Sequence, residues 1–396
     1  MRTDVAIVGA GPAGLSLAAC LAGSGLGIVL VERQPETVLA DPPFDGREIA
    51  LTHASQAMLA RLGAWGRLSE ADIAPIGEAR VLNGHMPLAL RLSPPERAGE
   101  PLGWFVPNHA IRRSLFETVV AQGEARFLCE RSAVGLELGG REARLSLDDG
   151  SAIDARLVVA ADTRFSILRG LAGIAADRLD FGKTMIVARV EHDRPNGRVA
   201  TEWYAHGYTI AMLPLRDHVS SAVLTVSPAE AARLMALSDE AYGAEVTRRY
   251  EGRLGRMRLV STRHPYPLVA VYARRFVARR FALAGDAAVG MHPTTAHGYN
   301  LGLSGAWTLA ECLREAASRG ADPGGARPLL AYAAAHRRAS LPMYHATNAI
   351  ARLYTDERAP AFLARAAVLA AGAALAPVRR AIVARLMARP PALAAA

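Results

Sequence analysis

The stretch that decides the fold is "DVAIVGAGPAGLSLAACLAGSGLGIVLVER", from Asp4 to Arg33. A short apolar run leads into the pattern Gly-x-Gly-x-x-Gly, small and apolar residues follow without a helix breaker, and a second apolar run ends in an acidic residue. Apolar runs bounded by glycine are typical of buried parallel strands, and the segment between them has the composition of a helix. The stretch therefore predicts a strand, a glycine turn, a helix and a second strand.

Each glycine of this turn has a physical role. Gly9 permits the tight turn, Gly11 lets the backbone approach a pyrophosphate, and Gly14 lets the helix pack close to the strand. The helix N-terminus presents free N–H groups and a positive dipole to the phosphates. Glu32, at the end of the second strand, is placed to accept hydrogen bonds from a ribose 2′-hydroxyl, which favours adenosine with a free 2′-OH. The pattern predicts dinucleotide binding rather than an ordinary glycine turn, with NAD and FAD both open at this point.

A second glycine-rich stretch, "FALAGDAAVGMHPTTAHGYNLGL" from Phe281 to Leu303, favours FAD over NAD. Its apolar start predicts another buried strand with Asp286 at the carboxyl edge, where ligands of open α/β sheets bind. That carboxylate would bind hydroxyls of a second ribose-like chain, and the helix beginning near Gly298 would favour negative charge on a reduced ring. Two loops far apart in the chain would thus hold both ends of one long cofactor. The alternative is a helix start whose glycines serve close packing.

Three motifs in this order resemble those of a known family. They are the glycine loop with Glu32, "LVVAADTRFSILRGLAGI" around Asp162, and the motif Gly285–Asp286. Over residues 1–345 the chain resembles the class A FAD-dependent aromatic monooxygenases, the para-hydroxybenzoate hydroxylase superfamily. Within that superfamily it is most similar to the ubiquinone-biosynthesis hydroxylases of the UbiH/UbiF/VisC type.

Two departures from the family pattern stand out. Thr163 occupies a position that is usually glycine, and Ala296-His297-Gly298 stands where most ubiquinone hydroxylases have Gly-Gln-Gly. The form "GMHPTTAHG" is similar to the UbiM-type branch, which is associated with late hydroxylation of the quinone ring, as on demethoxyubiquinol.

The resemblance implies an α/β fold with a Rossmann-like FAD-binding domain of the GR2 type, an antiparallel-sheet substrate domain and C-terminal helices. The β-branched and aromatic residues between Lys183 and Ser227, with turn residues between them, agree with such a sheet. The expected boundaries are 1–75, 100–182 and 265–345 for the FAD-binding domain, 76–99 and 183–264 for the substrate domain, and 346–396 for the C-terminal segment.

The fingerprint and the resemblance together name the residues expected to hold FAD. Three of these residues have an alternative role. Arg47 could be a solvated loop arginine, and Arg112 could be a surface charge while Arg113 makes the contact with FAD. Asp162 could cap a helix. The expected set is Gly9, Gly11, Pro12, Ala13, Gly14, Glu32, Arg33, Arg47, Arg112, Asp162, Gly285, Asp286, Pro293, Gly298, Tyr299 and Asn300.

Expectations about catalysis and substrate follow. His292 and His297 are the candidate proton carriers near the flavin, because histidine titrates near neutrality; His292 could instead be a structural loop residue. No metal site is expected. Candidates to line an apolar substrate pocket, with plain sheet core as the alternative, are Trp203, Tyr204, Tyr208, Met212 and Leu213.

The resemblance implies a reaction. NAD(P)H would act as a transient electron donor and O₂ as co-substrate, and the C4a-hydroperoxide of the flavin would hydroxylate an electron-rich ring. The expected substrate is a ubiquinone precursor, a small aromatic or polyprenylated quinol. Two alternatives stay open: a soluble phenolic or secondary-metabolite substrate, and a non-catalytic flavoprotein scaffold in a quinone-biosynthesis complex.

The composition of the chain limits the classes of partner and the cellular compartments that are expected. The 396 residues carry a net charge of +9, with Lys183 as the only lysine, and contain no zinc-ligand spacing or long basic block, so nucleic acid is not an expected partner. Three scattered cysteines suit a reducing compartment, and neither a signal peptide nor a long apolar run is evident. A cytoplasmic protein, at most peripheral to the inner membrane, is expected.

The C-terminal segment is rich in alanine and arginine. It predicts helices that either cover the FAD-binding domain with a solvated arginine face or rest on anionic lipid. The arginines concerned are Arg365, Arg379, Arg380, Arg385 and Arg389.

Overall fold

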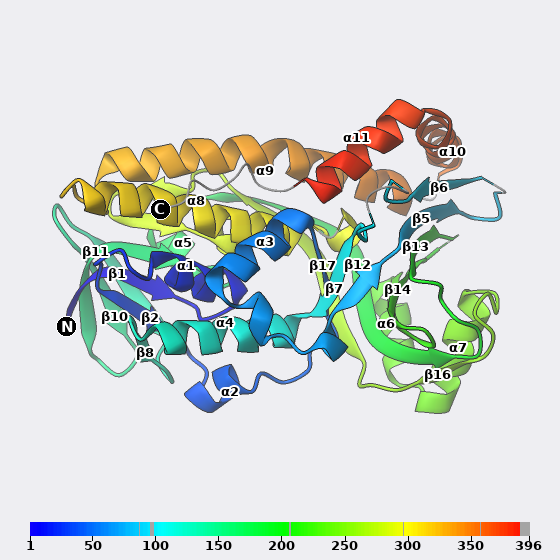
Figure 1. The fold of residues 1–396 in the computed structure, drawn as a ribbon, viewed down its shortest axis with the longest axis horizontal. Coiled ribbons are helices and arrows are strands. Elements are labelled where there is room, and N and C mark those ends of the chain that lie inside the picture. The colour runs from blue at the N-terminus through cyan, green and yellow to red at the C-terminus, as the bar shows by residue number, and fades with distance from the viewer. Residues whose placement is uncertain (87, 96–98, 206, 296, 357, 389–396) are drawn as a thin grey trace.

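In the computed structural model, two large sheets lie side by side and long helices run along one side of the molecule (Figure 1). The structure describes residues 1–388 apart from 87, 96–98, 206, 296 and 357; Ala296 and Arg389 therefore lie outside the described residues. The predicted α/β fold, with a parallel glycine-loop sheet, a second antiparallel sheet and C-terminal helices, is confirmed. The residue boundaries given to the domains stay a prediction.

The first sheet carries the glycine loop. Its strands are β1 (Arg2–Val8), β2 (Ile28–Val31), β8 (Ala125–Leu128), β9 (Ala133–Leu138), β10 (Ala143–Leu147), β11 (Ala152–Ala160), β18 (Val277–Ala278) and β19 (Phe281–Leu283). The order β8-β2-β1-β11-β19 is parallel throughout, and Val8 lies opposite both Val31 and Ala160. Because parallel strands end at one edge, the three motif-bearing loops leave the sheet on the same side.

The second sheet is mostly antiparallel. Its strands are β5 (Glu78–Asn83), β6 (Ala89–Leu92), β12 (Ala176–His192), β13 (Val199–Tyr204), β14 (Thr209–Arg216), β15 (Val219–Val226), β16 (Met257–Leu259), β17 (His264–Ala273) and β20 (Val289–Gly290). The order is β20-β17-β12-β15-β14-β13-β5-β6, with β16 beside β12. One face packs on helices α6 (Pro228–Met235) and α7 (Asp239–Arg249) around Trp203, Met212 and Tyr242. The other face is left to border a cavity.

A small sheet connects the two large ones. It contains β3 (Glu48–Leu51), β7 (Gly103–Pro107) and β4 (Ala74–Ile76) in that order. Buried Phe105 and Ile76 pack there with Val383 from the C-terminal helices.

Helices complete the first domain and the C-terminal layer. α1 packs beside both α4 and α8, α9 follows α8, and α10 lies across β6 (Figure 1). The bounds are α1 (Pro12–Leu21), α2 (Glu36–Ala40), α3 (His53–Leu62), η1 (Trp65–Arg67), η2 (Glu70–Asp72), α4 (Asn108–Gln122), α5 (Ile167–Leu171), η3 (Gly285–Ala287), η4 (Pro293–Thr295), α8 (Gly298–Ser318), α9 (Ala326–Thr355), α10 (Ala359–Ala374) and α11 (Ala376–Met387).

Candidate functional site

One cavity of about 1760 Å³ reaches from the glycine loop to the C-terminal helices. It is bordered by the carboxyl edge of the first sheet, one face of the second sheet, β7, and residues of α9, α10 and α11. Pockets for a single small molecule are roughly 300–1000 Å³. The cavity is therefore large enough for a cofactor and a second molecule together.

Two helices begin at this cavity without a side-chain cap. α1 starts after Gly11 and α8 starts at Gly298, and neither N-cap residue makes a side-chain hydrogen bond to the first turn. The first N–H groups of a helix lack partners within the helix and attract negative charge. A Cβ atom on Gly11 or Gly298 would meet no atom within 4 Å. Both glycines therefore face open space, which fits a cofactor lying against the backbone.

The other motif glycines serve close packing. A Cβ on Gly9 would lie 2.6 Å from the carbonyl oxygen of Ala161, and a Cβ on Gly14 would lie 1.9 Å from the carbonyl oxygen of Gly9. Gly285 has a φ of +58°, and its Cβ would lie 2.5 Å from that of Ala13. The two motifs that are distant in sequence therefore touch, and the methyl group of Ala13 leaves no room for a side chain at Gly285.

Glu32 is held by the backbone at the expected place. Its carboxylate accepts hydrogen bonds from the N–H groups of Ala10, at 2.8 Å, and Gln34, at 3.0 Å, and it borders the cavity. Each carboxylate oxygen has a second lone pair for a ribose hydroxyl. Exposed Arg33 borders the cavity beside it.

Two arginines line the cavity between the glycine loop and the small sheet. Arg112 has no acidic partner among the described residues, and burial lowers its pKa. Arg47 is paired to Asp45 at 2.6 Å, and Asp45 also accepts a hydrogen bond from Asn108 at 2.7 Å. Burial alone would raise the pKa of Asp45, but Arg47 and the hydrogen bonds lower it. Arg112 thus offers a cation without a counterion, which suits a phosphate, whereas Arg113 pairs with Asp72.

Asp286 lies at the cavity but is not free. Arg164 donates two hydrogen bonds to the carboxylate of Asp286, at 2.7 and 3.2 Å. Arg164 also donates to the carbonyl of Val269, which fixes the orientation of the ion pair. Asp162 also borders the cavity; burial raises its pKa, and one of its buried carboxylate oxygens has no partner. The helix-cap alternative for Asp162 does not describe the structure, because Ser166 caps α5.

The two histidines flank η4 at the cavity wall. His292 is buried, its Nδ1 accepts the N–H of Thr294 at 3.2 Å, and its ring lies against Phe181. Burial, helped by the charge of Arg164, lowers the pKa of His292 to about 4. The ring is therefore neutral at pH 7, so the expectation that it titrates near neutrality is not met. His292 borders the cavity, and its buried Nε2 has no hydrogen-bond partner among the described residues. His297 borders the cavity at the N-cap of α8.

The remaining motif residues differ in what they contact. Asn300 accepts the N–H of Thr52 at 3.1 Å and donates to the carbonyl of Ala50 at 2.8 Å, so it ties α8 to the small sheet. Pro293 and Tyr299 border the cavity, and burial raises the pKa of Tyr299.

The substrate-pocket prediction is wrong for three of its residues. Trp203 and Met212 lie on the face of the sheet that packs on α6 and α7, Tyr208 packs against the same cluster from the connection between β13 and β14, and none of the three borders the cavity. Trp203 instead donates to the carbonyl of Gly84 and Tyr208 to that of Arg249. Side chains alternate across a strand, so the cavity face carries their neighbours. Those neighbours include Tyr204 and Leu213, which were also candidates, together with Glu202 and Ala211.

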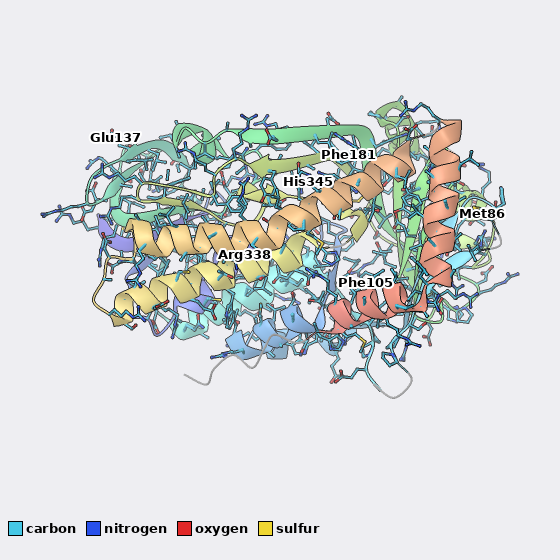
Figure 2. The ribbon with its side chains drawn as sticks, turned by 90° about the horizontal axis from the view of Figure 1, so that it is seen from above. Met86, Phe105, Glu137, Phe181, Arg338 and His345 are labelled. Atoms are coloured by element: carbon cyan, nitrogen blue, oxygen red, sulfur yellow. The ribbon has the colours of Figure 1, made fainter. Side chains whose placement is uncertain are left out.

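Two parts of the site were not predicted from the sequence. Glu202 borders the cavity beside Thr294, and burial raises its pKa to about 7. The C-terminal helices close the far end of the cavity, where Figure 2 shows α10 lying across the end of α9 beside the second sheet and α11 turning back toward Phe105. Their cavity-lining residues are Val368, Ala371, Gly372, Leu375, Val378, Ile382 and Leu386.

Comparisons with known proteins agree with this site. A family model described as FAD binding domain matches residues 2–339. The chain is 45% identical to ubiquinone hydroxylase UbiM of Neisseria meningitidis over 98% of this chain and 85% of that protein. It is 37% identical to ubiquinone hydroxylase UbiL of Rhodospirillum rubrum over 95% and 87% of the two chains. Among solved structures, p-nitrophenol 4-monooxygenase PnpA of Pseudomonas putida has the same fold, with a TM-score of 0.77 and 20% identity over 98% of this chain and 100% of that one.

Proposed function

Because this chain belongs to the FAD-binding family whose model spans residues 2–339, we propose that it is a flavin-dependent monooxygenase hydroxylating the aromatic ring of a ubiquinone precursor. The relatives named as ubiquinone hydroxylases support this substrate class. The observation that carries the proposal is one continuous cavity, which joins the loops expected to hold the cofactor to an apolar compartment ending at α10 and α11.

The residues at the glycine-loop end fit FAD. Glu32 would hold the adenosine ribose, Gly11 and Arg112 the pyrophosphate, Asp286 the ribitol, and the N-terminus of α8 the ring. When bound, FAD supplies the redox chemistry, taking electrons from NAD(P)H and passing one oxygen atom of O₂ to the substrate. The protein's own part is to hold the ring of the substrate, exclude water and manage protons.

The apolar compartment suits a ring that carries a hydrocarbon tail. Leu213 and Val223 of the second sheet line it from one side and Phe105 of β7 from another. Beyond them the cavity runs between Leu375 and Ile382 of the C-terminal helices. A polyprenyl chain would lie along this path, with its quinol ring toward α8.

The far end of the cavity lies at a surface that fits a bilayer. Leu363 is 69% exposed, and Leu375 is 51% exposed where α10 meets α11. Arg380 and Arg385 are exposed on α11, whereas Arg365 is buried and donates to the backbone carbonyl of Asp356. The sequence from 358 to 388 contains no acidic residue. We therefore propose peripheral contact with anionic lipid through α10 and α11.

Among the described residues no single helix is long and apolar enough to cross a bilayer. One pair of helices, Leu363–Ala374 and Ala376–Met387, has sufficient length and apolar composition when taken together, but the pair is bent by 82°.

Turnover tests the reaction. Purified holoprotein is mixed with NADH or NADPH, ¹⁸O₂ and a methoxylated hydroquinone carrying a short prenyl tail, and the product is read by mass spectrometry. We expect one ¹⁸O atom on the ring. Hydroxylation of soluble phenols alone would replace the substrate class, and FAD binding without turnover of any phenol would favour the scaffold role.

Vesicle sedimentation tests the membrane contact. Leu363→Asp should weaken binding to vesicles containing anionic lipid. Leu330→Asp is the matched control, because Leu330 is 61% exposed on α9. Equal binding by both variants, or no binding by the wild type, would refute the contact.

A further inference from the structure

Glu202 is an isolated carboxyl group inside the cavity. It belongs to β13 and is the one acidic side chain that the described residues of β12 to β15 present to the cavity. Its neighbours on that face are small or apolar, among them Ala200, Ala211 and Leu213. No basic side chain pairs with it in the part of the chain that the structure describes. The side chain is partly accessible because it faces the cavity, while protein encloses it elsewhere.

A hydrogen-bonded chain links Glu202 to the loop that precedes α8. The hydroxyl of Thr294 bonds to the carboxyl of Glu202, and the hydroxyl of Tyr204 lies 2.8 Å from the same Thr294 oxygen. The backbone N–H of Thr294 donates to His292. Tyr204 is fixed in turn by the ring of Tyr354 from α9, at 3.9 Å between centroids. Glu202 is therefore held on the substrate side of the residues expected to face the flavin.

The chemistry of the site selects a hydroxyl group. A carboxylate without a cation can only accept hydrogen bonds, so it favours a donor in the cavity and disfavours a carbonyl. A hydroquinone or phenol O–H is such a donor, and a quinone oxygen is not. An apolar wall with one placed polar group is how pockets fix orientation.

From this geometry, and resting on the function proposed above, we propose that Glu202 binds a ring hydroxyl of the substrate and accepts its proton. The ring O–H bond breaks, its electron pair stays on the ring oxygen, and the proton passes to a carboxylate oxygen of Glu202. The added electron density activates the ring carbon toward the oxygen atom that FAD, O₂ and NAD(P)H supply. When that carbon loses its hydrogen as a proton, which ends in the water formed from the second oxygen atom of O₂, Glu202 returns its proton to the ring oxygen.

Few other groups around Glu202 titrate near pH 7. Burial lowers the pKa of His292 to about 4 and raises the pKa values of Tyr204 and Tyr354. Burial raises the pKa of Glu202 itself to about 7, and the bond from Thr294 opposes that rise. The titratable and charged groups that border the cavity around Glu202 are Tyr204, Tyr354, His292, His297 and Arg80.

The pH dependence of turnover tests the proposal, with the hydroquinone of the preceding assay as probe. In the wild type we expect kcat/KM to rise through about pH 7 as Glu202 ionises. Glu202→Gln should lower kcat/KM about 100-fold and remove this rise, while FAD content stays full. Glu202→Asp should keep the rise. Glu191→Gln, on the exposed end of β12 in the same sheet, should leave the profile unchanged.

Two further measurements separate catalysis from structure. Thr294→Val removes the bond that favours the carboxylate, so the rise should move to higher pH. His297→Gln removes the other imidazole and should leave the rise in place. If Glu202→Gln keeps the full kcat/KM of the wild type and its rise with pH, the proposal is refuted.

Infrared difference spectroscopy reads the carboxyl without turnover. A protonated-carboxyl band should vanish as pH increases through about 7, be absent from Glu202→Gln, and reappear at pH 8 when the hydroquinone binds. If the wild type hydroxylates no phenol, the function proposed above is refuted. If, in addition, the carboxyl band does not respond to the hydroquinone, the proposed role of Glu202 is refuted as well. If the wild type is active but the band ignores the ligand, only the role of Glu202 fails.

Discussion

Replacing Glu202 with glutamine should stabilise the folded protein, and more so at higher pH. Burial raises the pKa of Glu202 from 4.5, the value of an exposed glutamate, to about 7. Each pKa unit of difference between folded and unfolded states is worth about 1.4 kcal/mol. Full ionisation of Glu202 therefore costs the folded state about 3 kcal/mol, a large share of a typical stability of about 5–15 kcal/mol.

The sign of the effect follows from proton binding. Between pH 4.5 and 7 the folded protein keeps the Glu202 proton that the unfolded chain has lost, so stability falls as pH rises. The penalty is nearly absent below pH 4.5 and complete above pH 7. Glutamine has almost the same shape and no charge, so Glu202→Gln avoids the penalty and retains an amide for Thr294.

Denaturant unfolding of the FAD-loaded proteins at several pH values measures this. The free energy of unfolding of Glu202→Gln minus that of the wild type should grow by about 2–3 kcal/mol between pH 5 and pH 8. Glu191→Gln, whose carboxylate is exposed beside Arg258, should show no such growth. A difference that is flat with pH for Glu202→Gln would refute the reasoning, because it would mean that the carboxyl is not desolvated.

Three further predictions concern the cofactor. Gly11→Val should leave a folded protein that lacks FAD, since the valine side chain enters the open cavity, whereas Gly14→Val should give little soluble protein. Circular dichroism and the flavin spectrum distinguish the two variants. Stoichiometric flavin in Gly11→Val would contradict the role of the loop. Arg112→Gln should weaken FAD binding about tenfold or more, because a charge-assisted bond to phosphate is worth roughly 1.5–3 kcal/mol; unchanged affinity by titration of the apoprotein would show that Arg112 is only a surface charge. Asp286→Ala should also lose FAD and leave Arg164 without its acidic partner, and a full yellow spectrum would count against the ribitol contact.

The glycine motifs could be predicted because their reasons are local. A turn at Gly9 and a close contact at Gly14 are dictated by the geometry of a strand followed directly by a helix. The expected family, fold and cofactor were confirmed for the same reason. The contact of Gly285 with Ala13 could be anticipated only because both loops end parallel strands of one sheet.

The substrate face could not be predicted because strand composition does not show which face is buried against which partner. Both faces of β13 carry aromatic residues, Trp203 on one and Tyr204 on the other, and both are buried. The helices that cover Trp203 come later in the sequence, and nothing near β13 indicates on which side they pack. Glu202, the one acid of β13, was the available clue, since a carboxyl is expensive to bury in a core and so tends to mark a cavity.

The C-terminal helices show how the two ends of the site depend on each other. Viewed as sequence, their alanine and arginine content fits a layer on the FAD-binding domain or a lipid-facing helix equally well. In the structure they pack on β5, β6 and α3, and Tyr354 at the end of α9 stacks on Tyr204. Tyr354 of α9, the helix that leads into α10, thus packs on the tyrosine whose hydroxyl bonds to Thr294 beside Glu202. Because α10 follows α9 and packs against it, displacing α10 and α11 to admit a hydrocarbon tail would reach the Tyr204–Thr294 contact through Tyr354, which would link entry of the tail to the environment of the carboxyl proposed to bind the ring hydroxyl.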